Sequence, residues 1–186
     1  MRIVIGGTRY HLTPAHQALI SRALGAAVTQ SVLGVKPALI TGCCKTGVDQ
    51  YVRQWALNHG WQVAIIPAAQ ASAHTYLPGT LTVITAHGRN AEALTMRTVT
   101  MASLGNQVLS FPLSSAYQKS GSWLLAHTAS IMHKTLGVIM PPTWQGQLPT
   151  CHNISSWQSL QAGGFFGGFC TGFSVWRPII QQVSLF

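Results

Sequence analysis

The chain has 186 residues, 47% of them apolar, which suffices for one domain with a sizeable core. Its 11 lysines and arginines face two acidic residues, Asp49 and Glu92, so the formal net charge is +9 and anionic partners are expected. No apolar run approaches the roughly 18 residues of a membrane span, and an apolar strand begins directly after Met1, which leaves no room for a signal peptide. We therefore expect a cytoplasmic protein with no membrane partner.

Short apolar runs alternate with helical patterns from residue 2 to residue 142. Strands are expected at 2–5, 38–41, 62–66, 107–111 and 137–140, and residues 81–84 form either a further short strand or a packed loop. Thr13 and Pro14 are a good helix start, and other helices are expected at 47–60, from 87–90 to 103, and at 121–135. The alternation predicts an α/β fold, a Rossmann-like doubly wound parallel sheet with right-handed crossovers.

The character of the sequence changes after Pro142. Residues 143–186 hold one charged residue, Arg177, together with three tryptophans and a glycine-aromatic run at 163–173. We expect a ligand-binding domain at 1–142, followed by an irregular or β-like C-terminal appendage at 143–186. Because only 7% of all residues are charged, we favour oligomerisation through this appendage and a homo-oligomeric protein. The alternative is that the appendage covers an edge of the monomer's own sheet.

The cysteines and histidines do not form a metal-binding pattern. Cys43 and Cys44 are adjacent, Cys151 and Cys170 lie far from them, and no pair has CxxC spacing. No two histidines share a helical face at ligand spacing. We expect buried free thiols, no metal site and no cofactor.

Ligands of open parallel sheets bind outside the carboxyl ends of the strands. Four expected loops lie at that edge, at 6–11, 41–47, 85–90 and 111–122. Each loop carries one basic residue, and these are Arg9, Lys45, Arg89 and Lys119. Four cations from separate segments at one edge predict a site for a phosphate-bearing ligand.

Four motifs with glycine or basic residues follow one another along the first 142 residues. They are Gly6-Gly7-Thr8-Arg9, the block from Thr41 to Asp49 with Trp55-Ala56, Gly88-Arg89-Asn90 followed by Met96, and Ser110-Phe111-Pro112 leading to Ser120-Gly121-Ser122. This order resembles the SLOG superfamily, in particular its YspA-like/YAcAr (DUF2493) members. The resemblance covers residues 1–142 and implies a Rossmann-like domain that binds nucleotides or nucleotide-derived ligands.

The resemblance also bears on catalysis. The related Lonely guy phosphoribohydrolases look like PGGxGTxxE, whose glutamate serves glycosidic cleavage, whereas this chain has Leu125 at the glutamate position. The two carboxylates present, Asp49 and Glu92, lie in different expected helices and are poorly placed to share acid and base roles. We therefore expect a binding protein with no catalytic residue.

The candidate ligand-binding residues lie in the edge loops and helix starts. Gly121 and Ser122 would present backbone N–H groups to phosphate beside Lys119, and Asp49 would accept ribose hydroxyls or, alternatively, stabilise its own helix. The full set is Gly6, Gly7, Thr8, Arg9, Gly42, Lys45, Gly47, Asp49, Arg89, Asn90, Lys119, Ser120, Gly121 and Ser122.

Three functions follow from these residues. The first is sensing or sequestering of a phosphorylated nucleotide or nucleotide-derived signalling ligand. The second is single-stranded DNA binding, because DNA-processing protein A of the same superfamily resembles this fold and the sequence pI is about 10.1. The third, a nucleoside-phosphate glycosidase, is disfavoured by Leu125.

Overall fold

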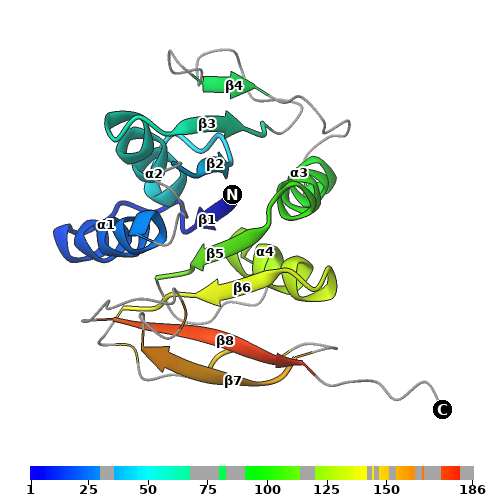
Figure 1. The fold of residues 1–186 in the computed structure, drawn as a ribbon. Helices are drawn as coiled ribbons and strands as arrows, with labels where there is room; N and C mark the ends of the chain where they lie inside the picture. The colour runs from blue at the N-terminus through cyan, green and yellow to red at the C-terminus, as the bar shows by residue number, and fades with distance from the viewer. Residues whose placement is uncertain are drawn as a thin grey trace.

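The computed structural model describes residues 1–29, 36–67, 80–82, 91–113, 120–141, 144, 147–150, 154–161, 165 and 173–180. Within these residues, eight strands form one sheet in the order β4-β3-β2-β1-β5-β6-β8-β7 (Figure 1). The strands are β1 (Arg2–Gly7), β2 (Ala38–Thr41), β3 (Gln62–Ile65), β4 (Thr80–Thr82), β5 (Gln107–Phe111), β6 (Thr135–Val138), β7 (Ile154–Gln161) and β8 (Ser174–Ile180). The helices are α1 (Pro14–Thr29), α2 (Gly47–Asn58), α3 (Ala91–Leu104) and α4 (Gly121–Ile131).

The first six strands are parallel, and β1 lies among them with a fully buried apolar core segment. Ile3, Val4 and Ile5 have no solvent exposure and pair with β2 on one side and with β5 on the other. Strands buried on both faces read as continuous apolar runs, which is why this short run could be recognised in the sequence. The prediction of a doubly wound parallel sheet is confirmed.

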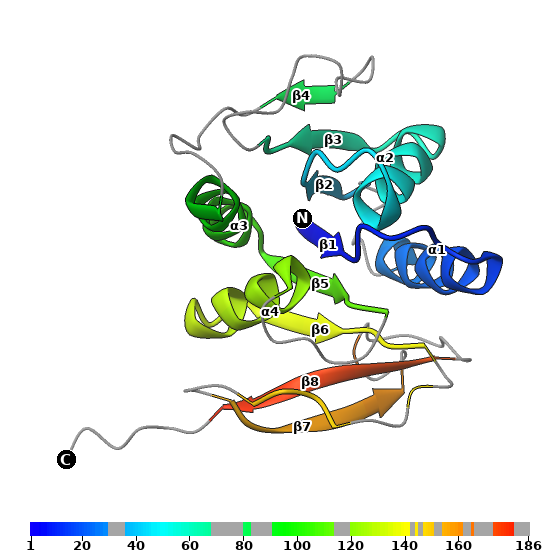
Figure 2. The same ribbon diagram turned by 180° about the vertical axis from the view of Figure 1, so that it is seen from behind.

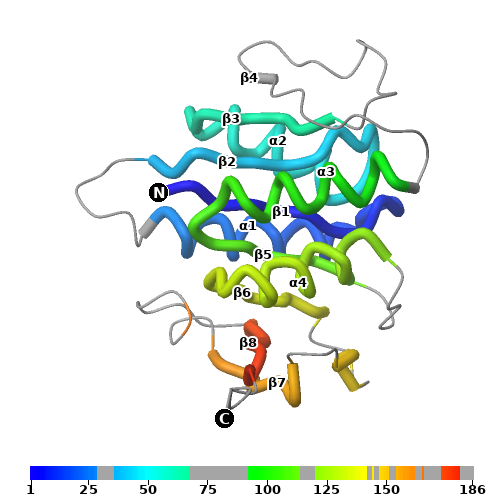
Figure 3. The backbone as a smooth tube through the Cα atoms, turned by 90° about the vertical axis from the view of Figure 1, so that its right-hand side faces the viewer, coloured from blue at the N-terminus to red at the C-terminus, as the bar shows by residue number. Residues whose placement is uncertain are grey.

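Helices cover both faces of the parallel part of the sheet. Helices α1 and α2 lie on one face, and α3 and α4 lie on the other, as the front, back and side views show (Figures 1, 2 and 3). Each face has its own apolar core: Leu19 and Val52 belong to the first, and Trp123 and Met101 belong to the second.

Two predicted boundaries near the end of the parallel sheet are wrong. The helix that begins at Gly121 ends at Ile131 rather than at residue 135, because His133 has a left-handed backbone conformation with φ of 53° that a helix cannot continue through. Strand β6 therefore begins at Thr135 rather than at Gly137, and Thr135 pairs with Gln107 of β5. In addition, β1 extends past Ile5 as far as Gly7.

The C-terminal segment extends the sheet as a β-structure. Strand β8 runs antiparallel to β6, with Val138 opposite Trp176, and β7 runs antiparallel to β8. Trp157 of β7 packs edge to face against Trp123 of α4, with ring centroids 6.1 Å apart. The segment therefore covers an edge of the monomer's own sheet, as the sequence allowed. The homo-oligomer remains a prediction. None of the helices in the described residues has the length and apolar character needed to cross a membrane.

Candidate functional site

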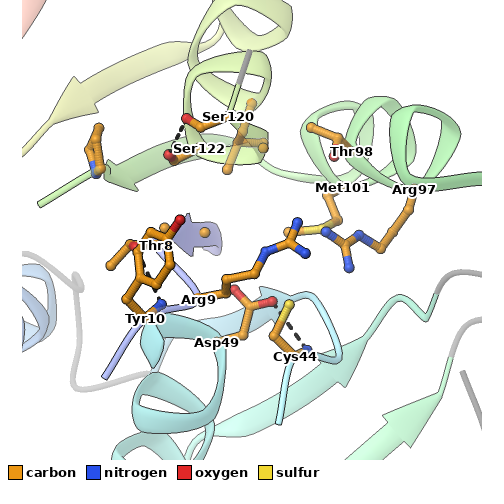
Figure 4. A pocket seen from close by; sticks show the side chains of 15 residues that line it. Thr8, Arg9, Tyr10, Cys44, Asp49, Arg97, Thr98, Met101, Ser120 and Ser122 are labelled. Atoms are coloured by element: carbon orange, nitrogen blue, oxygen red, sulfur yellow. Dashed lines mark hydrogen bonds between the residues drawn. The ribbon is translucent and has the colours of Figure 1, made fainter. Parts of the chain in front are cut away.

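A pocket of about 620 Å³ opens at the carboxyl ends of β1 and β5 (Figure 4). From β1 the chain passes through α1 to β2 on one side, and after β4 it returns to β5 on the other side of β1. This reversal of strand order is the topological switch point, where loops diverge and leave a crevice for ligands. We call the cavity the switch-point pocket.

One wall of the pocket is the segment from Gly6 to Tyr10 that leaves β1. Two backbone hydrogen bonds hold it: the Thr8 N–H donates to the carbonyl of Phe111 at 3.0 Å, and the Val48 N–H donates to the carbonyl of Thr8 at 2.9 Å. The Thr46 hydroxyl donates to the carbonyl of Arg9 at 2.7 Å. The backbone that carries Arg9 is therefore tied to both β5 and the start of α2.

The N-terminus of α4 forms the opposite wall. Ser120 caps this helix, since its Oγ accepts from the Trp123 N–H at 3.3 Å and lies 2.9 Å from the Ser122 hydroxyl. The buried Ser110 hydroxyl donates to the carbonyl of Ser122 at 2.8 Å, which anchors the helix start on β5. The first N–H groups of an α-helix lack intrahelical acceptors, so this turn presents donors and a positive dipole end to the pocket.

A buried arginine organises the loop between β2 and α2. Arg53 donates from Nη1 to the carbonyl of Gly42 at 2.8 Å and from Nη2 to the carbonyl of Cys44 at 2.9 Å. The Cys44 N–H in turn donates to Asp49 Oδ2 at 3.4 Å. Burial lowers the pKa of Arg53, and the nearby Asp49 carboxylate partly offsets that effect. This arrangement fixes Asp49 at the pocket wall with 6% exposure.

Among the described residues, two cations from different elements line the pocket. Arg9 lies on the exposed loop after β1, whereas Arg97 comes from α3 and is only 9% exposed. Their side chains point toward one another, with Asp49 and Cys44 beneath them (Figure 4). Burial alone lowers the pKa of Arg97, but the Asp49 carboxylate and the neighbouring thiols outweigh it, so the pKa lies above its ordinary value. Arg97 is therefore a permanent buried cation.

Cys44 is a neutral thiol at physiological pH. Its pKa is raised from 9.0 to about 11, first by burial and second by the negative charge of the Asp49 carboxylate. A thiolate is the nucleophilic form of cysteine, so Cys44 is not an activated nucleophile. Both Cys43 and Cys44 are partly exposed, which corrects the expectation that these thiols are buried. Within the described part of the chain, no three histidines, cysteines or carboxylates gather in a way that could hold a metal ion.

The rest of the lining includes Thr98 of α3 together with apolar and aromatic residues. Leu125 and Met101 line the interior with 2% and 3% exposure, and Tyr10 stands at the rim with 73% of its surface exposed. Leu125 thus places an apolar side chain inside the pocket. Asp49 is the one carboxylate that lines the pocket among the described residues, since Glu92 is exposed on α3.

The structure brings together a large share of the residues predicted for the site. Those that line the switch-point pocket are Gly6, Gly7, Thr8, Arg9, Asp49, Ser120, Gly121 and Ser122. Lys45 is exposed and is not part of the lining. Arg89, Asn90 and Lys119 lie outside the described residues.

Gly42 and Gly47 serve contacts within the protein rather than lining the pocket. A Cβ on Gly42 would collide with Asp49 Oδ2 and lie 3.3 Å from Arg97 Nη1. Gly47 has a φ of 72°, which favours glycine, and a Cβ there would collide with the carbonyl oxygen of Thr8. Both glycines thus allow the walls to approach each other closely.

Sequence reasoning missed Arg97. A signal for it existed, because Ala93 and Met101 lie four residues before and after Arg97 and are both buried, which places the arginine on the inner face of α3. A lone cation on an apolar helical face needs a buried anionic partner. Its position beside Asp49 and Cys44 depends on tertiary packing.

Comparison with known proteins supports the fold. No protein-family model matches the chain, and no curated protein matches its sequence. The structure is similar to that of DNA processing protein A from Helicobacter pylori, a protein described by its unique single-stranded DNA binding mode. The two chains are 18% identical with a TM-score of 0.53, and the match covers 74% of this chain and 64% of that one. This chain therefore spans less than two thirds of its structural neighbour, and the likeness shows a Rossmann-like fold.

Proposed function

We propose that the protein binds a phosphorylated nucleotide or nucleotide-derived ligand in the switch-point pocket, as a sensor or sequestering protein without catalysis. The observation that carries this proposal is the convergence of Arg9, Arg97 and the N-terminus of α4 on one cavity. Two guanidinium groups that point toward one another repel unless an anion lies between them. A phosphate there would accept hydrogen bonds from both arginines and from the first turn of α4.

Burial of Arg97 strengthens the case for an anionic ligand. Its Nε lies buried without a hydrogen-bond partner among the described residues, and such a donor costs free energy unless something accepts from it. The neighbouring Asp49 supplies one negative charge, whereas Arg9 and Arg97 supply two positive ones within the pocket lining. A ligand anion would balance the remaining charge.

The rim of the pocket suits a nucleoside. The exposed ring of Tyr10 is available to stack on a nucleobase, a contact worth about 1–3 kcal/mol in nucleic-acid-binding proteins. Asp49 would accept hydrogen bonds from ribose hydroxyls, as acidic residues do in dinucleotide-binding folds. Both groups line the same pocket as the two arginines.

The chemistry of the lining supports binding rather than hydrolysis. Leu125 is apolar, Cys44 is a neutral thiol, and glycosidic cleavage normally requires two carboxyl groups. Asp49 alone would have to supply both acid and base.

The test is calorimetric titration with inorganic phosphate, ribose 5-phosphate, and nucleoside mono-, di- and cyclic phosphates. We expect a nucleotide to bind with one-to-one stoichiometry, and Arg9→Gln to weaken binding at least about tenfold, since hydrogen bonds to charged groups contribute about 1.5–3 kcal/mol. Tyr10→Ala should weaken nucleotide binding while Tyr10→Phe retains it.

Arg22→Gln is the matched control, because Arg22 is exposed on α1, does not line the pocket, and its loss changes the net charge equally. Failure of every nucleotide to bind wild-type protein would reject the proposal, and so would equal affinities of the Arg9→Gln and Arg22→Gln variants.

Single-stranded DNA binding is the second candidate. Three observations favour it: the single-stranded DNA binding of the structural neighbour, the net charge of +9 and the exposed Tyr10. Binding of a strand would require cations along a path rather than in one cavity. The salt dependence of binding separates the two candidates.

A further inference from the structure

We infer that β7 is a self-association edge, through which two copies of this chain pair antiparallel strands to form one continuous sheet. The inference is independent of the nucleotide proposal, because β7 contributes no residue to the lining of the switch-point pocket. Strand β7 ends the strand order of the sheet and pairs only with β8 within the described part of the chain (Figure 1). Its outer side thus presents a row of backbone donors and acceptors.

The two edges of the sheet differ in how well they resist pairing. Strand β4 at the other edge has only three residues, which limits the number of ladder hydrogen bonds. Strand β7 has eight residues, Ile154–Gln161, with the sequence ISSWQSLQ. It contains neither lysine nor proline, the residues that commonly protect an edge, and its one irregularity lies at its start, between Ile154 and Ser156. Its central and C-terminal part is a regular template for another strand.

The charge distribution favours a second copy as the partner. A molecule with a net charge of +9 repels its own copies wherever cations face each other, so association is favoured at a face with few charges. Arg177 on β8 is the single charged residue of 143–186. Strand spacing is about 4.8 Å, so the two Arg177 residues would lie three strand spacings, roughly 14 Å, apart across a β7–β7 pair. That separation exceeds the Debye length of about 8 Å at physiological ionic strength.

The side chains of the hairpin are compatible with this arrangement. Ile179 and Ile180 of β8 are 46% and 36% exposed, although large apolar side chains are usually buried. As consecutive strand residues, the two isoleucines point to opposite faces of the sheet, so pairing of β7 with its copy would place one isoleucine of each copy on each face of the extended sheet. The polar residues Ser156, Gln158 and Ser159 are uncharged and exposed, so they add no repulsion.

Analytical ultracentrifugation over a concentration series tests the inference. We expect the wild-type chain of 20.0 kDa to sediment with twice that mass at higher concentration. The edge variant Ser156→Lys with Ser159→Lys places one lysine on each face of β7 and should remain monomeric. The matched control, Gln50→Lys with Gln54→Lys, adds the same charge at exposed positions of α2 and should dimerise like the wild type.

A second measurement guards against loss of folding in the edge variant. Hydrogen exchange of wild-type protein should show protection of the outward amides of β7 at high concentration and its loss on dilution. A wild-type chain that stays monomeric throughout, or an edge variant that folds and dimerises as the wild type does, would overturn the inference.

Discussion

The Cys44 thiol and the Asp49 carboxylate lie side by side in the pocket wall, and their proximity makes stability depend on alkaline pH. The pKa of Cys44 is raised from 9.0 to about 11 by burial, with Asp49 as the next cause. Between these two pH values an unfolded chain has lost the thiol proton, whereas the folded chain retains it. Because the folded state binds more protons in this window, the free energy of unfolding decreases as the pH rises from 9.0 toward 11.

We predict that Cys44→Ala removes this part of the pH dependence. The difference in free energy of unfolding between wild type and variant should shift by roughly 2 kcal/mol in favour of the variant across the window, since each pKa unit corresponds to about 1.36 kcal/mol. Urea denaturation with a reductant present, at pH 7 and at steps above pH 9, measures it. A difference that stays constant with pH would contradict the assigned environment of Cys44.

Individual residues also show how far sequence reasoning extends. Arg9, Ser120, Gly121 and Ser122 could be placed in the site because they immediately follow a strand or begin a helix, and the carboxyl edge of a parallel sheet collects such positions. Arg97 lies in the middle of α3, and its place in the pocket is set by how that helix packs across the sheet. The spacing of residues along the sequence does not predict how α3 packs, so it does not predict the place of Arg97.

At the scale of elements, a substitution in the first turn of α4 can change ligand binding without destabilising the fold. A Cβ on Gly121 would meet no atom within 4 Å, although this residue lines the pocket. The open space in front of the helix start is therefore available to a ligand. An alanine at this position fits the helical backbone and lowers the entropy of the unfolded chain, which stabilises proteins by about 0.4–1 kcal/mol.

We predict that Gly121→Ala leaves the thermal unfolding midpoint unchanged or slightly raised while nucleotide affinity falls about tenfold or more. The added methyl group would keep a phosphate from the N–H groups of the first turn, and hydrogen bonds to charged groups contribute about 1.5–3 kcal/mol. Calorimetry and thermal unfolding on the same samples measure both effects. Gly7→Ala is the contrasting variant, because its Cβ would collide with the carbonyl oxygen of Phe111 and should destabilise the fold. Wild-type affinity in Gly121→Ala would remove α4 from the proposed phosphate site.

Element boundaries were predictable where local chemistry sets them. Pro14 begins α1, and Thr13 Oγ1 accepts from the His16 N–H at 3.2 Å as expected of a cap. The end of α4 was not predictable, since no glycine marks it and His133 itself adopts the left-handed conformation. The pairing of β8 with β6 could not be predicted from the sequence either, because contact between two segments distant in the chain leaves no local sequence pattern.

Across the described part of the molecule, positive charges lie at both the carboxyl ends and the amino ends of the parallel strands. Lys36 and Lys134 precede β2 and β6, at the amino ends of the strands and therefore opposite the switch-point pocket. Lys36 Nζ donates to the carbonyl of His59 just past α2 at 2.7 Å, and Lys134 Nζ donates to the carbonyl of Ser103 in the last turn of α3 at 3.2 Å. Cations at helix C-termini complement the helix dipole. These two charges stabilise helix ends and do not extend the cationic pocket.

This distribution predicts a weak salt dependence for the ligand of the switch-point pocket. A nucleotide held by Arg9 and Arg97 should lose less than about tenfold in affinity between 50 and 200 mM salt, because short-range contacts with a partly buried cation are screened little. A protein that neutralises 6–10 phosphates of a nucleic acid loses about 10³–10⁵ over the same range. Titrations of a nucleoside monophosphate and of single-stranded DNA at both salt concentrations distinguish these cases, with Arg22→Gln as the variant that lowers net charge outside the pocket. Tight DNA binding with a steep salt dependence, weakened equally by Arg22→Gln and Arg9→Gln, would show that the positive charges act together as an extended surface. The function would then be binding of a nucleic-acid strand and not binding of a nucleotide in the pocket.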